Sequence, residues 1–313
     1  MKVYYKLIFL SLSLFCAGVF AQQDAQYTQY MYNTVAINPA YAGTRGALNV
    51  VGLHRSQWVG LEGAPRTQTL AIHSPIGIGR VGLGGSLVND AVGPASETYF
   101  NIDFSYTIPT SAFGKLSLGL KAGGRLFNVD FNKLSQFDAN DDIFRNNIDG
   151  QFSPVVGIGG YYHTKKLYIG LSAPNLLQTK HFDTTNSSSI AESSFIAKER
   201  LNYYLIAGYI FDLSDNVKFK PAALTKLVFG APLQVDLSAN FLFHDKFTAG
   251  LSYRWSAAVS ALLAFQVSDS MLIGFSYDRD TTELQEKNDG SFELMLRFEL
   301  IKKYSRLVTP RFF

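Results

Sequence analysis

The sequence predicts an all-β protein: an outer-membrane antiparallel β-barrel of about 14 strands, with an N-terminal segment in or near its lumen. Three observations predict this fold. Apolar and polar residues alternate strictly over many segments, the segments have the length of a tilted membrane-crossing strand, and the links between them alternate between long and short.

Alternation identifies the individual strands. In residues 99–108, YFNIDFSYTI, every even-numbered side chain is apolar or aromatic, whereas Asp103 and Ser105 are among the polar residues between them. Because strand side chains alternate between two faces, one face of this segment is apolar and the other polar. A soluble β-sandwich also alternates. Segment length, charges on the polar face and Tyr and Trp near segment ends favour the membrane barrel instead.

Fourteen such segments are present, an even number as single-chain bacterial barrels require. They span approximately residues 46–57, 66–74, 79–89, 97–108, 115–128, 152–163, 167–173, 198–212, 217–229, 232–243, 246–255, 258–268, 270–278 and 290–302. The three longest links, 129–151, 174–197 and 279–289, all follow odd-numbered segments, and four short links, 164–166, 213–216, 244–245 and 269, all follow even-numbered ones. This phase predicts long loops outside the cell and short turns in the periplasm, with both termini periplasmic.

Residues 1–21 have the features of a secretory signal peptide. Lys2 and Lys6 precede an apolar run over residues 7–20, and Val19 and Ala21 occupy the positions that signal peptidase reads. A lipoprotein signal at Cys16 is disfavoured because bulky Phe15 precedes it. We therefore divide the chain into a signal peptide (1–21), an N-terminal segment (22–43), a transmembrane barrel (44–302) and a periplasmic tail (303–313).

Composition excludes several classes of function. The single cysteine lies in the signal peptide, so neither a disulfide framework nor a thiolate metal site is expected. The formal net charge is only +3, and two of the lysines belong to the signal peptide, which argues against a nucleic-acid partner. Between residue 22 and the C-terminus, no apolar run reaches the ~18 residues of a membrane helix.

Motifs for catalysis or cofactors are weak. The glycines of GIGRVG (77–82) lack the following helix that a dinucleotide site needs. Residues 138–149, DANDDIFRNNID, have the alternating oxygen ligands of a calcium loop, but Ile143 replaces the turn glycine and Asp149 replaces the bidentate Glu. No nucleophile elbow or H-E-x-x-H accompanies the histidines. We expect no enzyme activity, no cofactor and no metal, and calcium at this loop stays open.

The N-terminal segment is the main candidate site. Residues 26–43, QYTQYMYNTVAINPAYAG, are rich in Tyr, Gln and Asn and contain no charged residue. Residues 26–33 have helical spacing, Asn38 is expected to be extended because a proline follows it, and Gly43 permits a turn into the first strand. We predict that the segment folds back and plugs the periplasmic half of the barrel, bonding to lumen groups such as Asn101, Asp103, Lys121 and Arg125. The residues expected to bind are Tyr27, Gln29, Tyr30, Met31, Tyr32, Asn33, Asn38, Pro39, Tyr41 and Gly43.

The C-terminus supplies a second candidate. The chain ends in PRFF, where Pro310 discourages strand continuation and Phe312 and Phe313 follow Arg311. These four residues are predicted to form a docking peptide, with a frayed tail as the alternative.

QYTQYMYNTVAINPAYAG, followed by SQWVGLEGAPRTQTL and ending in PRFF, resembles the PorP/SprF family of Bacteroidetes outer-membrane proteins. The resemblance implies a barrel of the type IX secretion and gliding machinery. It implies secreted adhesin cargo with a type IX C-terminal signal as one partner, and periplasmic envelope or peptidoglycan-associated components as others. The surrounding outer-membrane lipid is also a partner.

Two functions from different classes remain open. The first is a non-enzymatic outer-membrane component that supports export, anchoring or surface retention of large adhesins. The alternative is a diffusion channel or hydrophobic-solute transporter, since a barrel fold does not settle function.

Overall fold

The computed structural model describes residues 25–77, 79–133, 147–177, 201–229 and 231–300. Strands dominate this part of the chain: β1 (Leu48–Ser56), β2 (Arg66–Ile76), β3 (Val81–Val92), β4 (Ala95–Pro109), β5 (Lys115–Val129), β6 (Ile148–His163), β7 (Leu167–Ala173), β8 (Asn202–Tyr209), β9 (Phe211–Ser214), β10 (Val217–Val228), β11 (Gln234–Phe243), β12 (Phe247–Arg254), β13 (Ala258–Ser268), β14 (Met271–Asp280) and β15 (Ser291–Leu300).

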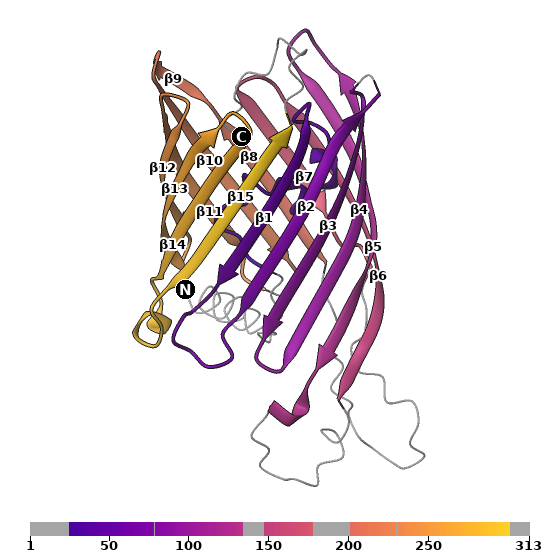
Figure 1. Ribbon diagram of the computed structural model, residues 1–313, viewed down its shortest axis with the longest axis vertical. Helices are drawn as coiled ribbons and strands as arrows, with labels where there is room; N and C mark the ends of the chain where they lie inside the picture. The colour runs from indigo at the N-terminus through magenta and orange to yellow at the C-terminus, as the bar shows by residue number, and fades with distance from the viewer. Residues whose placement is uncertain (1–24, 78, 134–146, 178–200, 230, 301–313) are drawn as a thin grey trace, which may run out of the picture.

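The strands form one closed antiparallel barrel (Figure 1). Apart from β8 and β9, which both pair with β10, each strand pairs with its neighbours in sequence. β15 pairs with β1, and the β10–β11 pairing completes the ring. Because β8 and β9 both pair with β10 and are separated only by Ile210, they act as one strand of a fourteen-stranded wall. The predicted fold class is therefore confirmed.

The outer and inner faces of the wall differ sharply in polarity. On β4, Ile102 is 70% exposed and Phe104 42%, whereas Asp103 and Ser105, which alternate with them, are fully buried. β15 repeats the pattern, with Glu293 buried between exposed Phe292 and Leu294. Apolar side chains thus face the surroundings and polar ones the interior, as in a barrel that sits in lipid.

The two ends of the barrel also differ. The links over residues 57–65 and 281–290 lie at one end, together with the end of β5 (Val129) and the start of β6 (Ile148), and we call it the long-loop end. The links over residues 164–166, 244–246 and 269–270 lie at the other, the short-turn end. Short 3₁₀ helices, η2 (Phe131–Lys133) and η4 (Glu283–Glu286), occur in the long links.

Within the described residues, no helix has the length and hydropathy of a membrane span. The predicted signal peptide (1–21) and the predicted tail (303–313), including Pro310, Arg311, Phe312 and Phe313, lie outside the described residues. Their roles stay predictions.

Candidate functional site: the N-terminal segment and its seat

Residues 25–47 precede β1 and contain little regular structure. Two short helices occur, α2 (Thr34–Ile37) and η1 (Pro39–Tyr41). Asn38 between them is extended (φ −140°, ψ 108°), as expected before a proline, and its side chain accepts a hydrogen bond from the Ala40 N–H at 3.0 Å. Gly43 has φ +71°, a conformation that glycine adopts without strain.

The helical spacing of residues 26–33 does not produce a helix. The backbone N–H groups of Thr28 and Gln29 donate to the carboxylate of Glu293, and the following residues form turns, with Tyr32 N–H bonded to Gln29 O at 3.0 Å. A four-residue helix, α2, forms only further on. The expectation of a helix here is wrong because tertiary contacts with the barrel outweigh the local preference.

The ten predicted binding residues of this segment are all buried: Tyr27, Gln29, Tyr30, Met31, Tyr32, Asn33, Asn38, Pro39, Tyr41 and Gly43. Several share an apolar cluster with inward-facing strand residues such as Val51, Leu53 and Tyr161.

Three charged residues of the wall, which we call the Arg55 cluster, hold the start of the segment. Glu293 accepts the N–H groups of Thr28 (3.0 Å) and Gln29 (2.8 Å), and Asp278 accepts the Thr28 hydroxyl at 2.7 Å. Arg55 lies between the two carboxylates, 2.7 Å from Asp278 and 3.3 Å from Glu293. All three side chains are almost completely buried. Such buried charges are tolerated only when paired and hydrogen-bonded, as here.

A second buried ion pair lies beside the first. Arg254 donates to Asp236 at 2.9 Å and to the Gln26 side-chain oxygen at 3.2 Å. Gln26 in turn donates to Gln234 at 3.3 Å. Asp236, Arg254 and Asp278 are all within three residues of the long-loop ends of their strands. The segment therefore begins at the long-loop end of the barrel.

Backbone carbonyls of the segment bind to the middle of the wall. Lys121 donates to the Ala36 carbonyl at 3.3 Å and forms an ion pair with Asp103 at 3.3 Å. Ser172 donates to the Ile37 carbonyl at 2.7 Å. These contacts satisfy helix-end carbonyls that would otherwise be buried without a partner.

Farther along, the segment reaches the short-turn end. Ser105 donates to the Ala42 carbonyl at 2.6 Å, and the Gly43 N–H donates to His73 Nδ1 at 3.2 Å. The guanidinium of Arg45 forms a buried, two-pronged ion pair with Glu299, the penultimate residue of β15.

These contacts correct two expectations. The segment does not confine itself to the periplasmic half; its contacts extend from the long-loop end at Gln26 to the short-turn end at Arg45. Among the four expected lumen partners, Lys121 bonds directly to the segment. Asn101 bonds to Ser86, Asp103 pairs with Lys121 and Arg125 pairs with Glu97, all on the strands. Charged groups on β1, β14 and β15 hold the segment instead.

Glycines on five different strands provide the space in which the segment lies. A Cβ added at Gly274 would overlap the Gln29 side chain, and at Gly159 or Gly170 the Asn38 side chain. At Gly119 it would overlap the Ala40 backbone, and at Gly82 the Ala42 carbonyl. We call these five residues the glycine seat. The inner wall is therefore shaped to fit this particular segment.

The glycine seat yields a first prediction. Gly119→Ala should displace η1, because the added methyl meets backbone atoms that cannot rotate away. Hydrogen exchange of the amides of residues 38–43 should accelerate by about fivefold or more, in keeping with a cost of ~1–3 kcal/mol for overpacking. The matched control is Gly52→Ala on β1, where the new methyl meets no atom within 4 Å. Equal exchange rates of these amides in the two variants would contradict the claim that Gly119 makes room for the segment.

The described residues contain no group of three or more His, Cys, Asp or Glu side chains that could hold a metal ion. Most of the candidate calcium loop, 138–149, lies outside the described residues.

The fold and the site together define a class: a closed membrane β-barrel whose inward-facing side chains bind the chain's own N-terminal segment. The chain belongs to the PorP/SprF family. The model of that family, described as type IX secretion system membrane protein PorP/SprF, matches residues 19–298. The predicted family is confirmed, and the protein is a membrane component of the type IX secretion system.

Other comparisons give distant likenesses. No curated protein matches the chain. Among solved structures, the chain is similar to the CymD monoaromatic hydrocarbon channel (13% identity, 91% of this chain, 96% of that chain, TM-score 0.49). It is also similar to Acinetobacter baumannii Omp33 (8% identity, 81% of this chain, 98% of that chain, TM-score 0.48). A third similar structure is a Pseudomonas aeruginosa FadL homologue (11% identity, 81% of this chain, 89% of that chain, TM-score 0.44).

Proposed function

We propose that this protein is a non-enzymatic outer-membrane component that supports the export, anchoring or surface retention of adhesin-type cargo by the type IX system. Its family membership supports the assignment to type IX secretion. The N-terminal segment inside the barrel supports a role in holding partners. In this proposal residues 25–47 close the lumen, so the protein acts by holding partners and not by conducting solutes.

One observation carries the proposal: the segment is bound along its whole course by buried charges and by wall positions without side chains. Three buried ion pairs and five glycines of the wall contact or accommodate this one 23-residue segment. A disordered leader would not need such specific contacts. A general diffusion channel, by contrast, needs a wet and open interior. The binding sites for cargo are then the surfaces at the two ends of the barrel.

The proposed orientation follows from the loop lengths. Outer-membrane barrels expose long loops to the outside and short turns to the periplasm. In that orientation the long-loop end faces surface adhesins with a type IX C-terminal signal. The short-turn end faces periplasmic envelope or peptidoglycan-associated components. The start of the N-terminal segment then lies toward the cell exterior, opposite to the orientation expected from the sequence.

The test is a strain that lacks this protein, complemented with the intact chain. We expect the strain to lose surface adhesin, measured by antibody labelling of whole cells, while uptake of small solutes stays unchanged. Complementation should restore labelling. Unchanged labelling combined with reduced solute uptake would contradict the proposal and favour the alternative, a diffusion channel or hydrophobic-solute transporter.

A further inference from the structure

Part of the outer wall near the long-loop end is polar, whereas large aromatic side chains are exposed elsewhere near that end. On β1 to β4, the outward positions His54, Gln68, Asn89 and Thr98 lie directly opposite one another in register. Asn89 donates to Thr98 at 2.9 Å. Elsewhere near the same end, the outward side chains include Trp255 (65% exposed) and Phe229 (64%). Four adjacent strands thus replace the aromatic girdle of a membrane barrel with hydrogen-bonding groups.

Arg66 extends this polar row by one outward position on β2. Arg66 and Gln68 are both exposed, and within the described part of the chain neither side chain makes a hydrogen bond or an ion pair. A guanidinium and an amide, side by side and unoccupied, are suited to an anionic group such as a phosphate, which Arg binds through two parallel hydrogen bonds.

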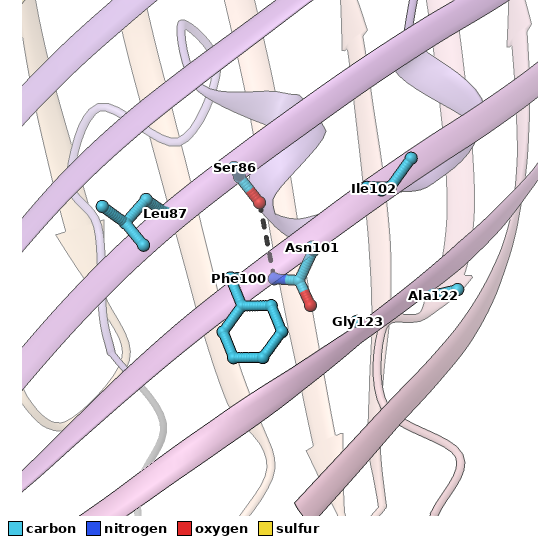
Figure 2. A pocket seen from close by; sticks show the side chains of 7 residues that line it. All are labelled: Ser86, Leu87, Phe100, Asn101, Ile102, Ala122 and Gly123. Atoms are coloured by element: carbon cyan, nitrogen blue, oxygen red, sulfur yellow. Dashed lines mark hydrogen bonds between the residues drawn. The ribbon is translucent and has the colours of Figure 1, made fainter.

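A hollow lies beyond the polar row, toward the middle of β3, β4 and β5. It has a volume of about 430 Å³, and its lining includes Leu87, Phe100, Ile102 and Ala122 (Figure 2). Gly85 and Ala122 flank Ile102 on the neighbouring strands, so small residues leave space on both sides of an exposed isoleucine. Behind it, Asn101 donates to Ser86 at 3.4 Å and joins the two strands (Figure 2).

The spacing of the two features matches an amphiphile. Leu87 and Phe100 lie two residues along their strands from Asn89 and Thr98, which is about 7 Å at the rise of a β-strand. Ile102 lies two residues farther. A polar row, then a bulky apolar row, then a hollow thus follow one another along the wall, with a free cation at the polar end.

We propose that this surface, defined by Arg66, Gln68, Asn89, Thr98, Ile102 and Ala122, binds one phosphate-bearing membrane lipid. The phosphate binds to Arg66 and Gln68, hydroxyl groups of the headgroup bind to Asn89 and Thr98, and one acyl chain lies in the hollow beside Ile102. A lipid is favoured over a protein partner because the surface lies on the lipid-facing side of the wall and combines an anion site with a hollow for a hydrocarbon chain.

The experiment uses the full chain purified in a neutral detergent and mixed with phosphatidylglycerol. Bound lipid is counted by native mass spectrometry as the lipid concentration is raised. Diacylglycerol with the same chains tests the need for phosphate, and inorganic phosphate alone tests the need for the chain. We expect saturable binding of one phosphatidylglycerol, little binding of diacylglycerol and no displacement by inorganic phosphate.

Two variants test the two halves of the site. Arg66→Gln should raise the Kd about tenfold, equivalent to about 1.4 kcal/mol. Ala122→Phe should fill the hollow and raise the Kd by a similar factor. The matched control is Ala261→Phe, an exposed outward position on β13, across the barrel. Far-UV circular dichroism confirms that each variant is folded.

The outcomes are distinct. Loss of binding in both variants but not in the control supports the lipid site. Loss in Arg66→Gln alone, or displacement by inorganic phosphate, means an anion site without a bound chain and overturns the proposal. Unchanged binding in both variants overturns it as well. So does co-purification of a protein that the variants release while lipid binding persists.

Discussion

Deletion of residues 25–36 is expected to turn a closed barrel into a conducting one. The deletion removes the contacts with the Arg55 cluster and the α2 turn that lies against Lys121. The strands keep their own ladder, because β1 begins at Leu48 and pairs only with β2 and β15. Water then enters an interior lined by Arg55, Glu293 and Lys121, which is the kind of lining that porin channels have.

The measurement is conductance in a planar lipid bilayer. We expect discrete current steps from the deletion variant and none from the intact protein under the same voltage. Removal of the four residues of η4 (Glu283–Glu286) from an exposed link serves as the control for a shortened chain. If the deletion variant conducts no more than the control, residues 25–36 do not close the lumen.

Replacement of Arg55 by Met should be the most destabilising single substitution in the interior. It leaves Asp278 and Glu293 buried without their cation, and breaking a buried ion pair in this way costs about 3–5 kcal/mol. It also weakens the hold on Thr28, whose hydroxyl accepts a hydrogen bond from Arg55 at 3.0 Å. The measured quantity is the free energy of unfolding in urea, from the barrel folded in detergent.

Two comparisons make this prediction specific. Lys166→Met removes an exposed pair with Asp212 (2.8 Å) and should leave the free energy of unfolding almost unchanged, because solvent screens exposed pairs. A triple variant, Arg55→Met with Asp278→Leu and Glu293→Met, should recover much of the lost stability, because no charge is then left unpaired. Equal losses from Arg55→Met and Lys166→Met would mean that Arg55 is not a paired, buried cation.

The sequence predicts the wall well because its signal is local. A period of two places Phe104 outside and Asp103 inside whatever the neighbouring strand is. The lengths of the links then indicate which end of the barrel carries the long loops and which the short turns. Even β8 and β9, interrupted at Ile210, are predicted as one strand because the alternation continues across the break.

The position of the N-terminal segment is not local information. Its burial follows from its composition, since ten uncharged and mostly aromatic or amide residues need an interior. Its direction depends on Glu293 and Asp278, which lie more than 240 residues away in the chain. The signal that could have identified them is the presence of two acidic residues and Arg55 at inward positions of neighbouring strands. Alternation alone cannot tell which lumen charges are used.

The position of Glu293 has a consequence for biogenesis. β15 follows all the other described strands in the chain, and it closes the ring by pairing with β1, which precedes them. Glu293 and Glu299 on this strand bind Thr28, Gln29 and Arg45, which precede β1 in the chain. The pairing of β15 with β1 and the binding of the N-terminal segment therefore depend on the same strand. A chain truncated before β15 loses both, so an incompletely synthesised molecule can neither close its wall nor hold its own N-terminal segment.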